Sequence, residues 1–256
     1  MLMALSVIPS IILFAIVWKF DTVEKEPPKL LWKLFFFGAL TIISASVIGL
    51  LGQYLLLGGV FPDEKSYIYL FIDNFILTAL VEEGGKFFVL KKVTWKNKEF
   101  NYTFDAVVYA VVVSLGFATF ENILYVFDGG IGTALARAVL SVPGHVIDAV
   151  FMGYFYGLAR YAQGAGDRAK EKSYLFMSLF IPVVMHGFYD FCLSADRGIF
   201  YILFVVYEIL ITVITIRQFI KLSKNDMLIP GMEAYPAEGN PPMEESTIQE
   251  DNSTEE

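Results

Sequence analysis

The chain has 256 residues, of which 56% are hydrophobic and only 18% are charged, and its mean hydropathy is +0.57. Soluble globular proteins carry about 25% charged residues, so this composition excludes an ordinary soluble domain. The apolar residues occur in blocks of about twenty, which is the helix length that crosses a hydrocarbon core about 30 Å thick. The sequence therefore predicts an all-α protein, a polytopic transmembrane helical bundle.

Seven spans are expected, with the N-terminus outside and the C-terminus in the cytoplasm. They cover 2–18, 34–57, 67–90, 105–127, 132–159, 174–194 and 198–218. Fifteen Lys and Arg residues lie in the first, third and fifth loops and after the last span, whereas the other loops contain only Lys65 and Arg197. Because basic residues favour cytoplasmic loops, this bias sets the predicted orientation.

The net charge of −8 describes the C-terminal segment rather than the membrane body. Residues 225–256 contain nine acidic residues and no Lys or Arg, so residues 1–224 sum to +1. The segment is also rich in Pro, Gly, Ser and Asn, a composition typical of disordered chains. We therefore expect a transmembrane domain over 1–224 and a disordered acidic cytoplasmic tail over 225–256.

An unusual polar stretch, Glu82-Glu83-Gly84-Gly85-Lys86, lies inside the third expected span. Ionisable side chains cost about 2.5–3.5 kcal/mol each at the centre of a membrane helix, and they usually mark a functional site. Lys86 can reach either glutamate, since residues three and four apart share a helix face. The two glutamates point about 100° apart, so one is expected to face the reacting centre and the other to be held. Sequence leaves open which is which.

Later spans add more ionisable residues. Both histidines of the chain lie in expected spans, and each has an acid one helical turn later. The candidate catalytic residues are Glu82, Glu83, Glu121, His145 and His186, and the candidate supporting residues are Lys86, Asn122, Asp148 and Asp190. Arg137, near the outer boundary of its span, is expected to have a structural role, reaching the headgroups or pairing with a carboxylate.

Three kinds of chemistry fit this set. A buried glutamate can activate water for hydrolysis, with a histidine to share the proton or hold the oxyanion. The same histidines and carboxylates can bind Zn²⁺, and they can also relay protons in a transporter. The sequence has no His-Glu-x-x-His motif and no recognisable Ser or Cys nucleophile motif. A metal-dependent protease and a proton- or ion-coupled transporter therefore stay open as alternatives.

The ordered motifs resemble those of the PrsW family of bacterial membrane proteases, which is related to the CAAX-processing and bacteriocin-processing membrane proteases. They are Glu82-Glu83-x-x-Lys86, Phe117-x-x-x-Glu121-Asn122, Pro143-Gly144-His145 and His186-Gly-x-x-Asp190. Two positions depart from the wider superfamily, which has His at the position of Glu121 and usually Asn at that of Asp190. We expect His145 to take the role of the histidine that the superfamily has at the position of Glu121.

The resemblance implies a glutamic-type intramembrane protease of the bacterial cell membrane that needs no metal or other cofactor. Glu82 is the leading candidate for the water-activating base with Glu83 as its partner, and His186 matches the histidine that stabilises the oxyanion. The implied substrate is a single-span anti-sigma factor in the lipid bilayer, which receives its first, site-1 cut. A second intramembrane protease then completes the release of the sigma factor in a stress response. No nucleic acid is expected as a partner.

Overall fold

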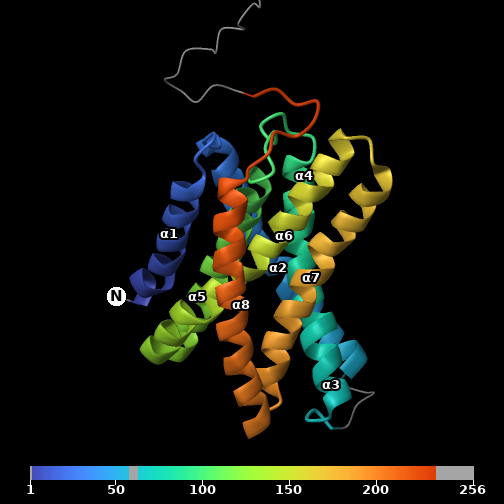
Figure 1. The fold of residues 1–256 in the computed structure, drawn as a ribbon. Helices are drawn as coiled ribbons and strands as arrows, with labels where there is room; N and C mark the ends of the chain where they lie inside the picture. Colours follow the sequence, from blue (N-terminus) through green and yellow to red (C-terminus); the bar gives the residue numbers. More distant parts are fainter. Residues whose placement is uncertain (1, 58–62, 235–256) are drawn as a thin grey trace, which may run out of the picture.

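The computed structural model describes residues 2–57 and 63–234, and this part of the chain forms helices and no β-strand. Its elements are α1 (Leu2–Phe20), α2 (Pro28–Gly52) with a π-helical end (Gln53–Leu57), α3 (Tyr67–Phe71), the π-helix η2 (Ile72–Ala79), α4 (Leu80–Thr94), α5 (Asp105–Val139), α6 (Ser141–Gly164), α7 (Arg168–Ser194) and α8 (Gly198–Lys224). The predicted all-α class is confirmed (Figure 1).

Five helical stretches of the described chain are long and apolar enough to cross a membrane. They are Met3–Phe20, Pro28–Leu55, Asp105–Gly164, Arg168–Ser194 and Gly198–Lys224. The fourth and fifth expected spans fall within one of them, the 60-residue stretch that covers α5 and α6. The third expected span is not among them. The protein is thus a multi-pass membrane protein, while the count of seven spans and the orientation stay predictions.

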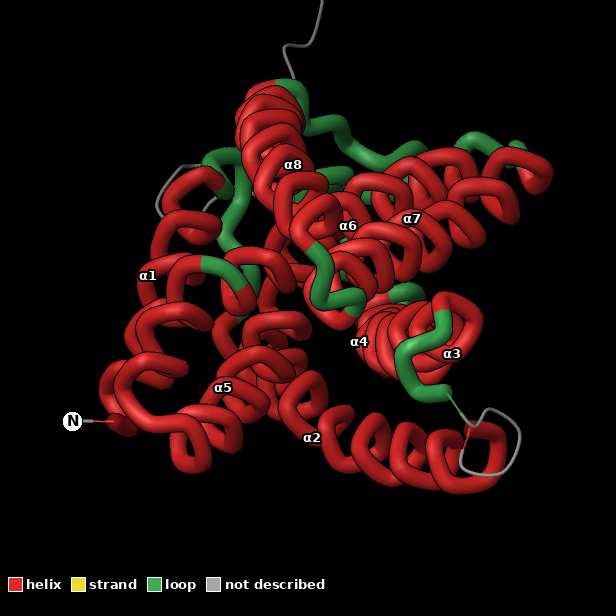
Figure 2. Tube along the Cα trace, turned by 90° about the horizontal axis from the view of Figure 1, so that it is seen from below, coloured by secondary structure: helices red, strands yellow, loops and turns green. Residues whose placement is uncertain are grey.

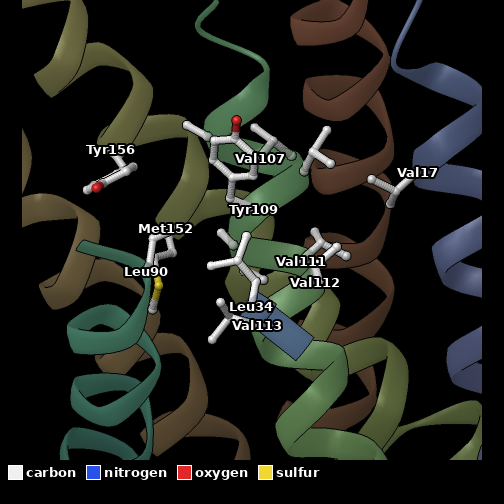
Figure 3. Close-up of a cluster of buried hydrophobic side chains, with 14 of the residues drawn as sticks. Val17, Leu34, Leu90, Val107, Tyr109, Val111, Val112, Val113, Met152 and Tyr156 are labelled. Carbon is white, nitrogen blue, oxygen red and sulfur yellow. The ribbon is translucent and has the colours of Figure 1, made fainter. Parts of the chain in front are cut away.

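Helix α5 is the central helix of the bundle and packs against α1, α2, α4 and α6. Its first half is apolar on every side, a pattern typical of a fully buried helix, and the side chains from Val107 to Val113 are at most 2% exposed (Figure 3). Gly116 lets α2 approach closely, because a Cβ atom there would lie 2.1 Å from the carbonyl oxygen of Phe35. The predicted site residues of α5, Glu121 and Asn122, lie beyond this buried segment.

Helix α4 lies between α2 and α7 when the bundle is viewed along its length (Figure 2). It continues the π-helix η2 without a break, and both elements contact α7. Helix α8 lies at the edge, with only Phe204, Thr215, Phe219 and Ser223 buried. The predicted polar residues are therefore carried by inner helices, and α8 supports them from outside.

The start of the predicted tail is packed against the body. Within residues 225–234, Asp226 accepts a 2.7 Å hydrogen bond from the backbone N–H of Phe104, just before α5, and the side chain of Ile229 is fully buried. The boundary predicted at 225 is thus too early, because this carboxylate and this apolar side chain hold the chain in place. Residues 235–256 lie outside the described residues, and the disorder predicted for them stays a prediction.

Candidate active site

A cavity of about 330 Å³ lies among η2, α4, α5, α6 and α7. Six of the nine predicted site residues line it, namely Glu82, Glu121, His145, Asp148, His186 and Asp190. The other three, Glu83, Lys86 and Asn122, lie behind this surface and contact the residues that line it. The structure therefore brings all nine together, although they come from four helices and span 109 positions of the sequence.

Glu83 and Lys86 form a buried ion pair. The Lys86 ammonium nitrogen lies 2.6 Å from Oε1 of Glu83, and both side chains are only 1% exposed. The same nitrogen lies 3.1 Å from Nδ1 of His145 and 4.2 Å from the centre of the Phe117 ring. A buried ion pair must recover the cost of desolvation from such contacts. Lys86 therefore joins α4 to α5 and α6.

Glu82 has a different environment although it is the next residue. Its side chain is 14% exposed and lines the cavity. Its Oε2 atom lies 4.0 Å from the Lys86 nitrogen and 3.9 Å from Nε2 of His186, and it has no hydrogen-bond partner among the described residues. The two glutamates are thus inequivalent, with Glu83 held by Lys86 and Glu82 directed to the cavity.

His186 is held by carboxylates on both sides. Its Nδ1 atom lies 2.9 Å from Oε1 of Glu83, and its Nε2 atom lies 3.2 Å from Oδ2 of Asp190. The second contact confirms that His186 and Asp190 share a helix face. A third carboxylate, that of Asp148, lies 3.9 Å from Nδ1. Because both ring nitrogens face carboxylate oxygens, a role for His186 at an oxyanion would require one of these contacts to open.

His145 connects the ion pair to Glu121. An ammonium group only donates hydrogen bonds, so the contact with Lys86 makes Nδ1 of His145 the acceptor. The proton of the neutral ring then lies on Nε2, which is 2.9 Å from Oε2 of Glu121. The backbone carbonyl of His145 accepts a 2.8 Å hydrogen bond from Ser114, which fixes α6 to α5. His145 and Glu121 therefore form a polar pair at the cavity wall.

Arg137 is a cavity residue that the sequence reasoning left outside the site. Its Nη2 atom lies 2.6 Å from Oε2 of Glu121, and its Nε atom lies 3.1 Å from Oδ1 of Asn122. Pairing with a carboxylate was one of the two expected outcomes, but a position in the reaction cavity was not expected. In a straight helix, residues 121 and 137 would lie about 24 Å apart.

The chain reverses at Gly130, and this reversal explains the position of Arg137. Gly130 has φ 74° and ψ −156°, a conformation open essentially only to glycine. Helix α5 is therefore two helical segments, and the second, residues 131–139, returns along the first. The Gly129-Gly130 pair was the sequence signal for this turn, since adjacent glycines weaken a helix.

The donor set fits a divalent metal ion. Ligand atoms of Glu83, His145, Asp148 and His186, all buried, lie within 4.8 Å of one another, and so do those of Glu82, Glu121 and His145. In the described chain, Oε2 of Glu82 and Oε2 of Glu83 are buried without hydrogen-bond partners. Imidazole and carboxylate are common zinc ligands. The Lys86 ammonium already contacts Glu83 and His145, so it would compete with a metal for two of these ligands.

Comparison with known proteins identifies the family of the chain. Residues 26–216 match the family described as "PrsW family intramembrane metalloprotease". The chain is 35% identical to Protease PrsW of Clostridioides difficile (strain 630), over 82% of this chain and 86% of that protein. It is 34% identical to Protease PrsW of Geobacillus kaustophilus (strain HTA426), over 77% and 81% of the two chains. For Protease PrsW of Bacillus subtilis (strain 168), the identity is 34% over 76% and 84%.

No solved structure matches the chain. The family match covers most of the described helices, including all four that carry the polar residues. The relatives are aligned over more than four fifths of their own length. The chain therefore belongs to the PrsW family of intramembrane proteases and is a peptidase.

Proposed function

We propose that this peptidase makes the first, site-1 cut in a membrane-anchored anti-sigma factor in the bacterial cell membrane. A second intramembrane protease then acts on the product, and the sigma factor is released for an envelope-stress response. The resemblance of the ordered motifs supports this substrate class. A polar cavity within an apolar bundle also suits a substrate that arrives through the bilayer as a single helix.

We assign Glu82 as the general base, and the observation that carries this assignment is that its side chain lines the cavity, whereas Glu83 lies behind it, held by Lys86 and His186. Water in the cavity gives a proton to Glu82 as its oxygen bonds to the carbonyl carbon of the scissile peptide. Glu83, held by Lys86 and His186, keeps α4 in place and stays out of proton transfer. His145 and Glu121 form a second polar pair that can accept and return a proton on the other side of the cavity.

The substrate assignment is tested by co-expressing the protein with each anti-sigma factor of the same genome. We expect one of them to be shortened in the presence of the wild-type chain. Replacement of Glu82, Glu83 or His186 by Ala should remove this cleavage, because each change removes a carboxylate or imidazole from the site. Immunoblotting of the substrate provides the measurement. Cleavage that persists in all three variants would contradict the proposal.

A metal-dependent peptidase is a second candidate, favoured by the buried ligand atoms of Glu83, His145, Asp148 and His186. A zinc ion bound there would lower the pKa of a bound water and polarise the peptide carbonyl. In that case Glu83 and the two histidines would bind the metal, and Glu82 would still accept the proton of the water.

Chelation separates the two candidates. On the glutamate proposal, we expect purified protein to keep its cleavage rate after treatment with a chelator and to gain none with added Zn²⁺. Metal content, measured on the purified wild type and the His145→Ala/His186→Ala variant, gives a readout independent of activity. A stoichiometric metal in the wild type that is lost in the variant, together with chelator-sensitive cleavage, would establish the metal-dependent candidate instead.

A further inference from the structure

We propose that Arg137 stabilises the oxyanion that forms on the carbonyl oxygen of the scissile peptide. This inference rests on the proposed function, since it takes Glu82 as the base. Arg137 lies outside the sequence motifs, and the reversal of the chain at Gly130 brings it into the cavity.

Arg137 is the one lysine or arginine among the described residues that line the cavity. The two histidines there are already engaged, because His186 faces Glu83 and Asp190, and His145 faces Lys86 and Glu121. A guanidinium group carries five N–H donors. Arg137 uses Nη2 and Nε, and no hydrogen-bond partner occupies Nη1 within the described part of the chain. It can therefore bind an additional oxygen without losing a contact.

The guanidinium group is held in one orientation from several sides. Glu121 binds Nη2, Asn122 binds Nε, and the Tyr125 ring centre lies 4.2 Å from the central carbon. Asn122 is itself fixed, since its amide donates a 2.8 Å hydrogen bond to the backbone carbonyl of Ser6 in α1. Donors that are oriented before the reaction stabilise developing charge most effectively, because they need no reorganisation.

Arg137 and Glu82 both lie close to Glu121. Ligand atoms of Glu82, Glu121 and His145 lie within 4.8 Å of one another, and Arg137 contacts Glu121 at 2.6 Å. Both Arg137 and Glu82 line the same cavity. A peptide whose carbonyl carbon faces water at Glu82 can therefore direct its oxygen toward the guanidinium group.

The proposed reaction is hydrolysis of the peptide bond by one water molecule. The water oxygen bonds to the carbonyl carbon, its proton moves to Glu82, and the π electrons move to the carbonyl oxygen beside Arg137. When the C=O bond re-forms, the C–N bond breaks, and the proton passes from Glu82 to the departing nitrogen. The products are a carboxylic acid terminus and an amine terminus. Arg137 exchanges no proton in either step.

The test uses full-length protein in proteoliposomes with a substrate that it cleaves. We expect Arg137→Gln to lower kcat about 10²–10³-fold with little change in KM, which is the effect of removing one oxyanion donor. Arg137→Lys should recover part of kcat, since it restores charge without the planar fork. The control is Arg197→Gln, which removes an arginine that directly precedes α8 and does not line the cavity, and it should leave kcat unchanged.

A purely structural role predicts other results. If Arg137 only neutralises Glu121, the Glu121→Gln/Arg137→Gln variant should cleave as fast as Glu121→Gln alone. On our proposal, kcat of the double variant is lower than that of Glu121→Gln alone, by about the same factor by which Arg137→Gln lowers kcat of the wild type. Recovery in the double variant, or a rise in KM with unchanged kcat, would overturn the proposal.

Binding measurements keep this inference separate from the proposed function. In a Glu82→Gln background, adding Arg137→Gln should leave the affinity for the substrate nearly unchanged, because the oxyanion is absent from the bound ground state. If Arg137→Gln lowers the substrate affinity of the Glu82→Gln variant by as large a factor as it lowers kcat of the wild type, the oxyanion role is overturned. Full cleavage by Glu82→Gln alone would instead overturn the general-base assignment, whatever the Arg137 variants show.

Discussion

Glu82→Gln should lower kcat about 10²–10⁴-fold, the usual contribution of a general base, while KM and the unfolding midpoint stay nearly unchanged. Glutamine has the size of glutamate but cannot accept a proton from water. The side chain lines the cavity, and its Oε2 atom has no hydrogen-bond partner in the described chain, so the change should remove no hydrogen bond of this atom. Cleavage rates of reconstituted protein provide the measurement.

Glu83→Gln is the matched control, because the same change is made one residue further along the helix. Glu83 binds both Lys86 and His186, so its loss leaves the buried Lys86 cation with only the more distant Glu82 carboxylate, at 4.0 Å. We expect this variant to unfold more easily than Glu82→Gln in a denaturant titration. A Glu83→Gln variant that is as stable as the wild type but inactive, beside an active Glu82→Gln variant, would show that the two roles are reversed.

The gathering of the polar residues could be predicted because its physical cause is visible in the sequence. Ionisable groups are costly in a membrane helix, and helical spacing decides which of them share a face. Eight of the nine predicted residues that meet at the site are ionisable and follow from these two rules, which also pair His186 with Asp190, whereas Asn122 came from the motif resemblance. The all-α class followed in the same way from the apolar blocks of the sequence.

The roles of the two adjacent glutamates could not be predicted, because they depend on how α4 is rotated in the bundle. That rotation is set by contacts with distant residues. Lys86 contacts His145, 59 positions away, and Glu83 contacts His186, 103 positions away. Local spacing allowed Lys86 to hold either glutamate. Only the packing of α6 and α7 against α4 places Glu83 beside Lys86 at 2.6 Å and leaves Glu82 at 4.0 Å.

The position of Arg137 in the cavity could not be predicted for a different reason. Hydrophobic periodicity describes a helix as straight, and the reversal depends on the φ and ψ angles of one residue, Gly130. The packing of residues 225–234 was also hidden, because their composition is polar while a few of them, such as Ile229, are buried. The conformation of one residue, Gly130, decides the first case, and the burial of a few side chains such as Ile229 decides the second. Neither can be predicted from the average hydrophobicity of the segment.

Lys86→Met should destabilise the folded protein by about 3–5 kcal/mol, the usual effect of removing one partner of a buried ion pair. Methionine has a similar length and fits an apolar position, so the cost should come from the charge left on Glu83 rather than from a cavity. Lys86 is 1% exposed, and it also contacts His145 and the face of the Phe117 ring. Denaturant titration of the wild type and the variant gives the free-energy difference.

The double variant Glu83→Gln/Lys86→Met decides whether the cost arises from the pair. Without either charge, no buried ion remains uncompensated, so the double variant should be more stable than Lys86→Met alone. Residues in direct contact usually couple by about 0.5–3 kcal/mol in such cycles. Strictly additive effects would show that Lys86 stabilises the bundle through His145 and Phe117 instead. In that case Glu83 would be available for chemistry, and the assignment of Glu82 as the base would depend on the kinetic comparison alone.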